Sequence, residues 1–180
     1  YISDMLQIMS SFIASSLKRR NLRRRLEDLS YKDALTRLGN RFALIKDVES
    51  LNREQSIAVV YCDVTGLKTV NDTLGHEAGD QLLLRACSCL EQAFGDYRVY
   101  RIGGDEFLAV CSPIDRETLD ERMESLKASM QAQAVNMAVG TTWREMATEN
   151  LYPMVQEAER RMYADKAAYY QKNGIDRRRR

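Results

Sequence analysis

Residues 97–111 constrain the fold of this chain more than any other stretch, because two strand-like runs flank Gly103-Gly104-Asp105-Glu106. The flanks are rich in aromatic and β-branched residues, which suit a pleated, half-buried surface. Two adjacent glycines between such runs predict a tight hairpin that uses backbone angles closed to other residues. Two carboxylates beside bare backbone suit a hard cation that carries a phosphate ligand. A solvated acidic turn explains this segment equally well on its own.

The composition favours one globular domain with an added element, since the chain has 180 residues, 44% hydrophobic and 29% charged. The net charge of +1 excludes binding of a polyanion through overall charge. No signal peptide and no apolar run long enough to span a bilayer is expected. The cysteines lack CxxC spacing, which indicates reduced thiols in a cytosolic protein. They are Cys62, Cys87, Cys89 and Cys111.

Residues 1–29 contain neither glycine nor proline, and apolar residues recur at alternating spacings of four and three. This heptad pattern predicts a helix that pairs with a second copy of itself. Because the pattern is already under way at Tyr1, the chain is interpreted as a fragment of a longer protein. The basic residues at 18–25 are interpreted as a solvated helix face, with nucleic-acid or membrane-surface binding as the alternative. The seam is Tyr1, Met5, Ile8, Phe12, Ser15, Arg19, Leu22, Leu26 and Leu29.

The next elements are a helix and a strand. Gly39-Asn40 is interpreted as a turn that closes the first helix. Residues 41–51 are predicted to form a second helix, with apolar contacts from Phe42, Ile45 and Val48. Residues 57–62 are apolar at every position, which predicts a strand covered on both faces. The strand ends in Asp63, a position that suits a ligand, although a cap or a solvated end is about as common.

A glycine-bearing turn at 65–68, a short helix, a break at Gly75 and a long helix to residue 94 are predicted next. Backbone amides at a turn that enters a helix hold phosphate well, and Lys68 lies there to assist. The only histidine, His76, is by itself typical of a structural or surface residue. The inner face of the long helix is Leu82, Leu83, Ala86, Leu90 and Ala93.

After the hairpin the sequence predicts a helix over 115–133, a strand over 135–142 and a final helix over 154–172. The whole order predicts an α+β fold with a small mixed sheet that carries helices. The inward residues of the two helices are Leu119, Met123, Leu126 and Met130, then Val155, Ala158, Met162 and Ala168.

Four motifs, in order, resemble those of the GGDEF family, the diguanylate cyclases. Gly103-Gly104-Asp105-Glu106-Phe107 resembles the signature, and Asp33-Ala34-Leu35-Thr36 with Asn40-Arg41 resembles the first motif. The second motif corresponds to Asp63, Lys68, Asn71, Asp72, Gly75, His76, Gly79 and Asp80. The closing helix corresponds to Ala158, Glu159, Met162, Tyr163 and Lys166. The resemblance implies a domain over 30–176, after a linker helix over 1–29 and before a basic tail at 177–180.

The resemblance implies a palm-like fold akin to nucleotidyl cyclases and polymerases, with a central mixed β-sheet flanked by helices and preceded by a coiled-coil signalling helix. It implies that two GTP molecules are joined into cyclic di-GMP with release of two pyrophosphates. It further implies that two domains face each other in a homodimer, which we expect to form through the N-terminal helix, under an upstream sensor outside this chain. No nucleic-acid partner is expected. The expected location is the bacterial cytoplasm, with membrane attachment of the full-length protein left open.

Phosphoryl transfer to a ribose 3′-hydroxyl needs metal ions that neutralise the triphosphate and activate the oxygen. The resemblance implies Mg²⁺ or Mn²⁺ held by Asp63, the Val64 carbonyl and Asp105. It implies Glu106 either as a further metal contact or as the base, and both roles stay open. The implied catalytic residues are thus Asp105 and Glu106. The implied substrate-binding residues are Leu35, Gly66, Leu67, Lys68, Asn71, His76, Asp80, Gly103, Gly104 and Lys166.

Base selection follows from the residues that resemble the guanine pocket. Asp80 resembles the family's guanine-reading carboxylate and Asn71 the amide beside it, with Leu35 lining the pocket. A carboxylate accepts from both donors of guanine, whereas adenine offers only a lone pair at N1. The resemblance therefore implies strong discrimination against ATP.

The chain departs from the family pattern at several positions. Arg37 stands where the family commonly has glycine, Thr65 where it often has a second acid, and Tyr170 where many members carry a phosphate-binding arginine. The family's inhibitory Arg-x-x-Asp is replaced by Phe94-Gly95-Asp96-Tyr97, which predicts that no inhibitory site is present. Two alternatives to an active cyclase remain, a GTP-binding regulatory domain without turnover and a dimerisation module.

Overall fold

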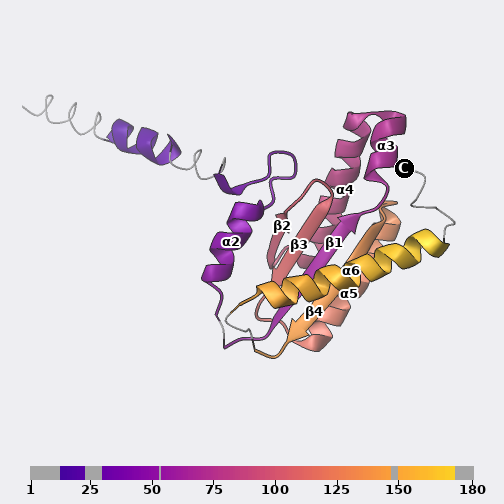
Figure 1. The fold of residues 1–180 in the computed structure, drawn as a ribbon. Coiled ribbons are helices and arrows are strands. Elements are labelled where there is room, and N and C mark those ends of the chain that lie inside the picture. Colours follow the sequence, from indigo (N-terminus) through magenta and orange to yellow (C-terminus); the bar gives the residue numbers. More distant parts are fainter. Residues whose placement is uncertain (1–12, 23–29, 53, 147–149, 173–180) are drawn as a thin grey trace, which may run out of the picture.

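The computed structural model describes residues 13–22, 30–52, 54–146 and 150–172. Residues 13–22 are helical and exposed at every position, and the rest of the predicted coiled-coil seam lies outside the described residues, as does the basic tail. The labelled elements in Figure 1 are α2 (Arg41–Glu49), β1 (Ile57–Val64), α3 (Leu67–Leu74), α4 (His76–Phe94), β2 (Arg98–Arg101), β3 (Glu106–Cys111), α5 (Arg116–Ala132), β4 (Met137–Arg144) and α6 (Tyr152–Lys172).

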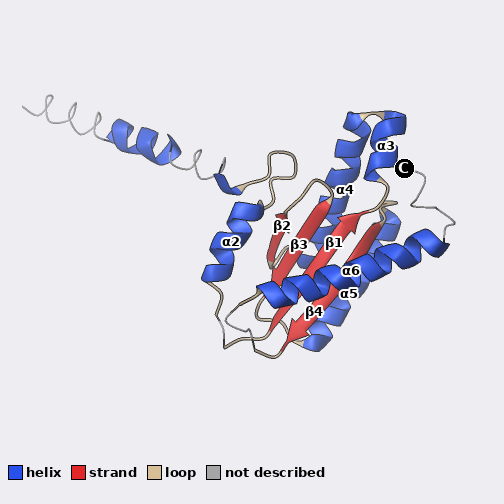
Figure 2. Ribbon diagram, in the orientation of Figure 1, coloured by secondary structure: helices blue, strands red, loops and turns tan. Residues whose placement is uncertain are grey.

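The four strands form one sheet in the order β2-β3-β1-β4, and each neighbouring pair is antiparallel. The prediction of a mixed sheet is therefore wrong for these strands. In the part of the chain that the structure describes, parallel pairing is limited to an isolated bridge between Gly39 and Tyr100. Every residue of β1 is buried, as its continuous apolar run predicted. Figure 2 shows this α+β architecture, with helices on both faces of the sheet.

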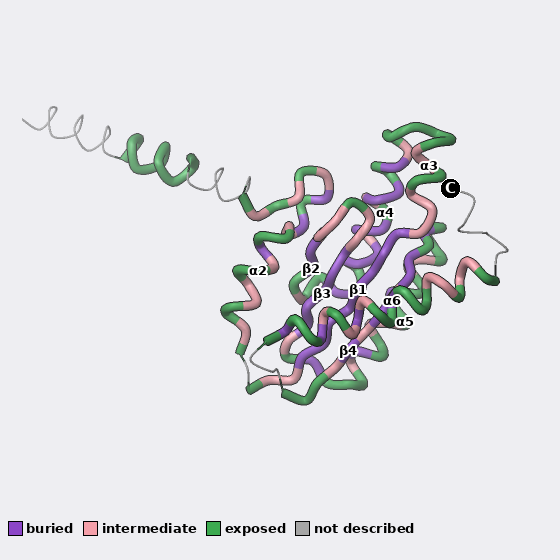
Figure 3. The backbone as a smooth tube through the Cα atoms, viewed as in Figure 1, coloured by how far each residue is buried: buried purple, intermediate pink, exposed green. Residues whose placement is uncertain are grey.

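Helices α4 and α5 cover one face of the sheet, and α6 crosses the other (Figures 1 and 3). The core is divided accordingly, because successive side chains of a strand point to opposite faces. Ala58, Val60 and Cys62 belong to the cluster beneath α4 and α5. Val59 and Tyr61 belong to the cluster beneath α6. Alternation along β1 thus turns the next odd-numbered position, 63, towards α6.

Several local predictions are confirmed. The short helix, the break at Gly75 and the long helix lie where the sequence predicted them, and Gly75 has a φ of 87°. Asp115 is the N-cap of α5, since its Oδ1 accepts a hydrogen bond from the Thr118 backbone N–H at 2.7 Å. The inner face of α4 is buried as expected. All four cysteines are buried and free.

Other predictions are wrong in instructive ways. Asn40 caps α2, because its side chain accepts from the Phe42 and Ala43 backbone N–H groups at 2.9 and 3.1 Å. Gly39-Asn40 therefore opens the second helix and does not close the first. Of the three predicted apolar contacts of α2, Val48 packs partly buried against the cluster beneath α6, whereas Phe42 and Ile45 are 68% and 55% exposed. The buried residue of α2 is Ala43.

The start of β4 and the predicted inner face of α6 also differ from prediction. β4 begins at Met137, because the Val135 N–H is already bonded to Met130 O at 2.9 Å. Ala168 is exposed, since the last turns of α6 run past the strands (Figure 1). Within the described residues, no helix combines the length and apolarity that crossing a bilayer requires.

Candidate functional site

The register of the sheet gathers the predicted acids at one end of β1. Asp63 and Glu106 are direct Cα partners across β1 and β3. Such partners point to the same face with Cβ atoms about 4.5–5.5 Å apart. The Val64 N–H donates to Asp105 O at 2.8 Å, which fixes Asp105 beside the end of β1. Three acids from two distant parts of the sequence, Asp63 on one side and the adjacent Asp105 and Glu106 on the other, therefore share one corner of the sheet.

Of the two hairpin glycines, Gly103 is needed for space, and neither is needed for a left-handed backbone angle. Among the described glycines, positive φ is confined to Gly66 and Gly75, so the predicted reliance on special angles at the hairpin is wrong. A Cβ added at Gly103 would overlap the Glu106 side chain, whereas one at Gly104 would meet nothing. Gly103 thus makes room for the Glu106 carboxylate, and Gly104 leaves a bare backbone surface next to it.

Lys166 of α6 occupies the centre of this corner. Its Nζ lies 2.6 Å from both carboxylate oxygens of Asp63. The two side chains are only 15% and 7% exposed. Burial raises the pKa of Asp63, Lys166 lowers it, and the charges of Asp105 and Glu106 raise it further, so the net shift is upward. The corner therefore carries an excess of negative charge that one ammonium only partly offsets.

Tyr61 orients the neighbouring acid. Its hydroxyl donates to Glu106 Oε1 at 3.1 Å. Burial raises the pKa of Tyr61 well above its ordinary value, and the Glu106 charge adds to the rise, so the phenol stays protonated and keeps donating. The sequence analysis missed Tyr61. The available signal was its place two residues before Asp63, which puts both side chains on one face of the strand.

The donor set suits a hard divalent cation. In the described part of the chain, no three His, Cys, Asp or Glu side chains converge tightly enough to hold a metal ion as they stand. Asp63 is bonded to Lys166 and Glu106 to Tyr61 instead. Carboxylate and carbonyl oxygens are nevertheless the ligands that Mg²⁺ and Mn²⁺ prefer. The Lys166 ammonium, bonded to both oxygens of Asp63, shows that this position attracts positive charge.

The predicted phosphate turn follows the acids directly. Gly66 caps α3 with a φ of 84°, a left-handed conformation that favours glycine. The Thr65 N–H donates to Asn136 O at 2.9 Å, which anchors the turn to the segment before β4. Leu67 begins α3 and the exposed Lys68 follows, so backbone amides of a helix start lie just beyond Asp63. Such amides favour an anion.

Asn71 and Asp80 come together where α3 packs on α4. A Cβ added at Gly79 would overlap the Asn71 amide, so Asn71 lies directly on the α4 backbone, one residue from Asp80. Asp80 and His76 are both exposed on the first turns of α4. Leu35 packs partly buried against the cluster beneath α4 and α5. The structure thus places the Asn71 amide against the residue before Asp80, and it leaves both Asp80 and His76 at the surface.

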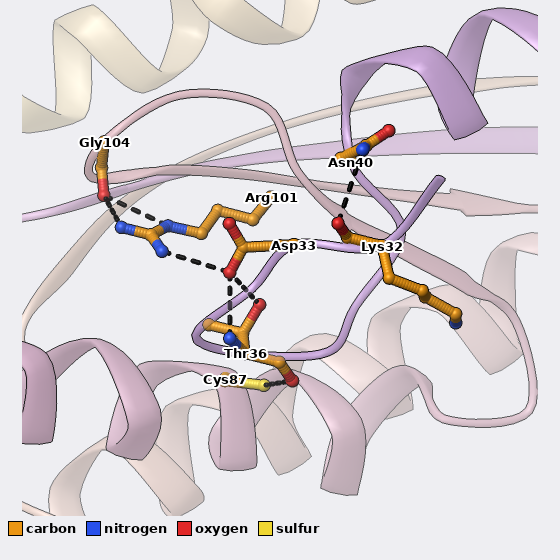
Figure 4. Close-up of polar contacts among 7 residues, drawn as sticks. All are labelled: Lys32, Asp33, Thr36, Asn40, Cys87, Arg101 and Gly104. Atoms are coloured by element: carbon orange, nitrogen blue, oxygen red, sulfur yellow. Dashed lines mark hydrogen bonds and ion pairs between the residues drawn. The ribbon is translucent and has the colours of Figure 1, made fainter. Parts of the chain in front are cut away.

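The first motif is tied to the hairpin by an arginine that the sequence analysis missed (Figure 4). Asp33 Oδ1 accepts from Thr36 N at 2.8 Å, from Thr36 Oγ1 at 2.8 Å and from Arg101 Nη1 at 3.1 Å. Arg101 also donates to Gly104 O through Nη2 at 2.7 Å and Nε at 3.2 Å. Burial raises the pKa of Asp33, but these hydrogen bonds outweigh burial and the net shift is downward.

The structure shows how two of the departures from the family pattern, at Arg37 and at residues 94–97, are accommodated. Arg37 adopts a φ of 62°, a left-handed conformation that glycine takes without strain. Phe94 is fully buried, so it belongs to the core. Asp96 is bonded to Arg122 of α5 at 2.7 Å, and the Arg122 guanidinium lies 5.9 Å from the centre of the Tyr97 ring. These residues therefore pack α5 against the end of α4.

Comparison with known proteins gives consistent results. The family model described as "Diguanylate cyclase, GGDEF domain" matches residues 30–172. MucR of Pseudomonas aeruginosa, a bifunctional diguanylate cyclase/cyclic di-GMP phosphodiesterase, is 33% identical over 131 residues, which are 68% of this chain and 19% of MucR. Diguanylate cyclase DgcP of Escherichia coli is 30% identical over 144 residues, 72% of this chain and 41% of DgcP. This chain thus spans less than half the length of either relative.

A solved structure shares the fold. The coiled coil and GGDEF domain of DgcB from Caulobacter crescentus, in complex with c-di-GMP, is similar with a TM-score of 0.75. The match covers 89% of this chain and 95% of that one, at 21% identity.

Proposed function

The chain belongs to the GGDEF family of diguanylate cyclase domains, and from this premise we propose that it condenses two GTP molecules into cyclic di-GMP with release of two pyrophosphates. The observation that carries the proposal is the pairing of Asp63 with Glu106 across the sheet, with Asp105 bonded to the next residue of β1. A corner of three acids beside bare glycine backbone suits a metal-bound triphosphate.

Asp63, the Val64 carbonyl, Asp105 and Glu106 would hold Mg²⁺ or Mn²⁺. Bound ions of this kind neutralise a triphosphate and activate a ribose 3′-hydroxyl. Tyr61 holds Glu106 in place through its hydroxyl, in either role that Glu106 takes. The bare backbone at Gly103 and Gly104 lets a nucleotide lie against the hairpin.

The remaining residues grip the substrate. The amides that begin α3, at Gly66 and Leu67, face the β- and γ-phosphates, with Lys68 and Lys166 as cations. Asn71 and Asp80 read guanine, and Asp80→Ser should relax the preference for GTP over ATP because it removes the paired acceptor. Competition between GTP and ATP measures this, and an unchanged preference would contradict the role of Asp80.

Turnover requires two such domains facing each other. We propose that residues 1–29 pair with a second copy and so raise the effective concentration of one domain near the other. Deletion of these residues should lower activity in dilute protein and leave GTP binding intact. We also propose that product does not inhibit through residues 94–97, since Asp96 bonds to Arg122 and neither charged partner of the family's inhibitory site is present.

A GTP-binding regulatory domain without turnover is the second candidate. The bond between Lys166 and both oxygens of Asp63 favours it, because a cation must compete with this ammonium. The departures at Arg37, Thr65 and Tyr170 point the same way.

One experiment separates these functions. The purified protein is incubated with GTP and Mg²⁺, and nucleotides are separated by chromatography, with Asp63→Asn as the matched inactive variant. Cyclic di-GMP from the unaltered protein and none from the variant supports the cyclase. GTP binding without product supports the regulatory domain, and absence of GTP binding overturns both.

A further inference from the structure

Helix α6 is fastened to the outer edge of the sheet by two side chains. β4 is the last strand of the sheet, so one side of its backbone has no strand partner among the described residues. Asp165 Oδ2 accepts from the Val139 N–H at 2.9 Å, and Arg161 Nη1 donates to Thr141 O at 2.6 Å. Backbone groups on the open side of an edge strand otherwise need water or another chain. The Asp165 and Arg161 side chains therefore satisfy two backbone groups on the open side of β4.

A glycine between these two bonds brings the helix and the strand into backbone contact. A Cβ added at Gly140 would overlap Ala158 O and the backbone N of Met162. Near the start of the helix, Thr142 Oγ1 also donates to Met154 O at 3.2 Å. The close approach and the bonds on either side of Gly140 leave α6 little freedom to slide along β4.

Lys166 follows Asp165 directly and reaches the acid corner. Its Nζ bonds to Asp63, and Asp63 is the Cα partner of Ala138, the residue before Val139. Two consecutive helix residues are thus tied to two neighbouring points of the sheet. Holding a long, flexible lysine side chain in one contact costs rotamer entropy, so a backbone held within reach of Asp63 favours that contact over others.

We propose that Asp165, together with Arg161, is a positioning residue that holds the α6 backbone where Lys166 reaches Asp63. The consequence for turnover rests on the proposed function, whereas the contact with Asp63 does not. Asp165 suits this role because its carboxylate accepts a backbone N–H. From the sequence pattern of the helix alone, Asp165 would be taken for a solvent-exposed acid next to Lys166.

The first test follows the Lys166 amine itself, by mass spectrometry after brief acylation with an amine-reactive reagent. Lys127, which is 61% exposed, serves as the internal reference. In Asp165→Ala, acylation of Lys166 should rise about threefold or more relative to Lys127, because its site opens more often. Asp165→Asn keeps an oxygen that accepts the Val139 N–H. Acylation of Lys166 in this variant should therefore stay close to that in the unaltered protein.

Asp115→Ala is the matched control, since it removes another carboxylate that accepts a backbone N–H, on a helix far along the chain. It should lower the thermal unfolding midpoint without changing acylation of Lys166. Equal acylation of Lys166 in Asp165→Ala and the unaltered protein would overturn the proposal. So would a rise in Asp115→Ala of the same size, because it would reflect general loosening.

The second test asks whether Asp165 acts through Lys166. Asp165→Ala should raise KM for GTP about tenfold, as expected when a binding group is misplaced. Added to Lys166→Met, the same change should have no further effect, since the group that it positions is gone. Equal effects in both backgrounds would overturn the positioning role. A protein that makes no cyclic di-GMP would contradict the proposed function, and the acylation result would still decide the positioning of Lys166.

Discussion

Asp33 and Asp63 are both aspartates paired with a cation from a distant element, yet their surroundings shift their pKa values in opposite directions. One oxygen of Asp33 accepts from Thr36 twice and from Arg101 once, and its pKa is lowered. Asp63 faces one ammonium, burial and two further acids, and its pKa is raised. A carboxylate with enough donors stabilises the fold as an anion, whereas one with too few donors, such as Asp63, is disfavoured as an anion. This difference fits the cation-binding role that we propose for Asp63.

The largest expected effect is on the acid with too few donors. Asp63→Asn should reduce cyclic di-GMP formation by about 1,000-fold or more, because it removes a charged ligand from the proposed metal corner. It should lower the free energy of unfolding less than Asp33→Ala, since burial already disfavours the charge of Asp63. Chromatographic assay and denaturant unfolding measure the two quantities. Retained turnover in Asp63→Asn would contradict the proposed role of Asp63 as a metal ligand.

The other aspartate should matter for stability. Asp33→Ala removes three accepted hydrogen bonds and leaves the Arg101 guanidinium, 13% exposed, without its carboxylate. We expect the free energy of unfolding to fall by about 2 kcal/mol. Asp120→Asn is the control, because its 3.9 Å pair with Arg116 is exposed and should contribute less than about 0.5 kcal/mol. Equal losses in the two variants would contradict the structural role of Asp33.

The stabilising role of Asp33 should depend on pH. Its pKa in the folded protein lies below the ordinary 3.8, so its contribution is present above that value and is lost as the pH falls through the folded pKa. Urea unfolding of the unaltered protein and Asp33→Asn, compared between about pH 6 and about pH 3, measures this. The stability difference should shrink towards acid. A difference that stays constant would show that the charge on Asp33 contributes nothing.

The smallest expected change in the free energy of unfolding comes from backbone strain at Arg37, in the turn that follows Asp33. The Arg37 N–H donates to Asp33 O at 3.0 Å while Arg37 keeps a φ of 62°. Arg37→Gly should raise the free energy of unfolding by about 0.5–1 kcal/mol, because glycine takes this conformation without a steric penalty. Arg85→Gly, in the middle of α4, should lower it by about 1 kcal/mol. Destabilisation by both substitutions would mean that Arg37 carries no strain.

The sequence predicted what local pattern and chain order determine. The apolar run of β1 requires cover on both faces, Gly75 breaks a helical pattern, and Asp115 begins one. The motif resemblance also singled out Asp63, Asp105, Glu106 and Lys166, which lie together in the structure. By contrast, the sequence predicted a turn at the start of α2 because asparagine fits a turn as well as a cap, and two of the predicted contacts of this helix, Phe42 and Ile45, are exposed.

The part of the site that the sequence did not predict consists of long-range contacts. The residues in the bond from Lys166 to Asp63 are 103 positions apart, and those in the bond from Arg101 to Asp33 are 68 apart. No spacing rule relates such positions, since only the folded register brings them together. The same holds for Asp165, whose partner Val139 becomes an edge residue only once the strand order is known.

The buried cysteines give this protein an experimental advantage. Burial raises the pKa of Cys87 and Cys111 to about 12 and that of Cys62 higher still, so these thiols carry almost no reactive thiolate. Cys89 is equally enclosed, at 0% exposure. A cysteine placed on the exposed helix at 13–22 would therefore accept a spin label selectively, with the native thiols left in place. Dipolar coupling between two labelled copies would then test the proposed pairing of the N-terminal helices.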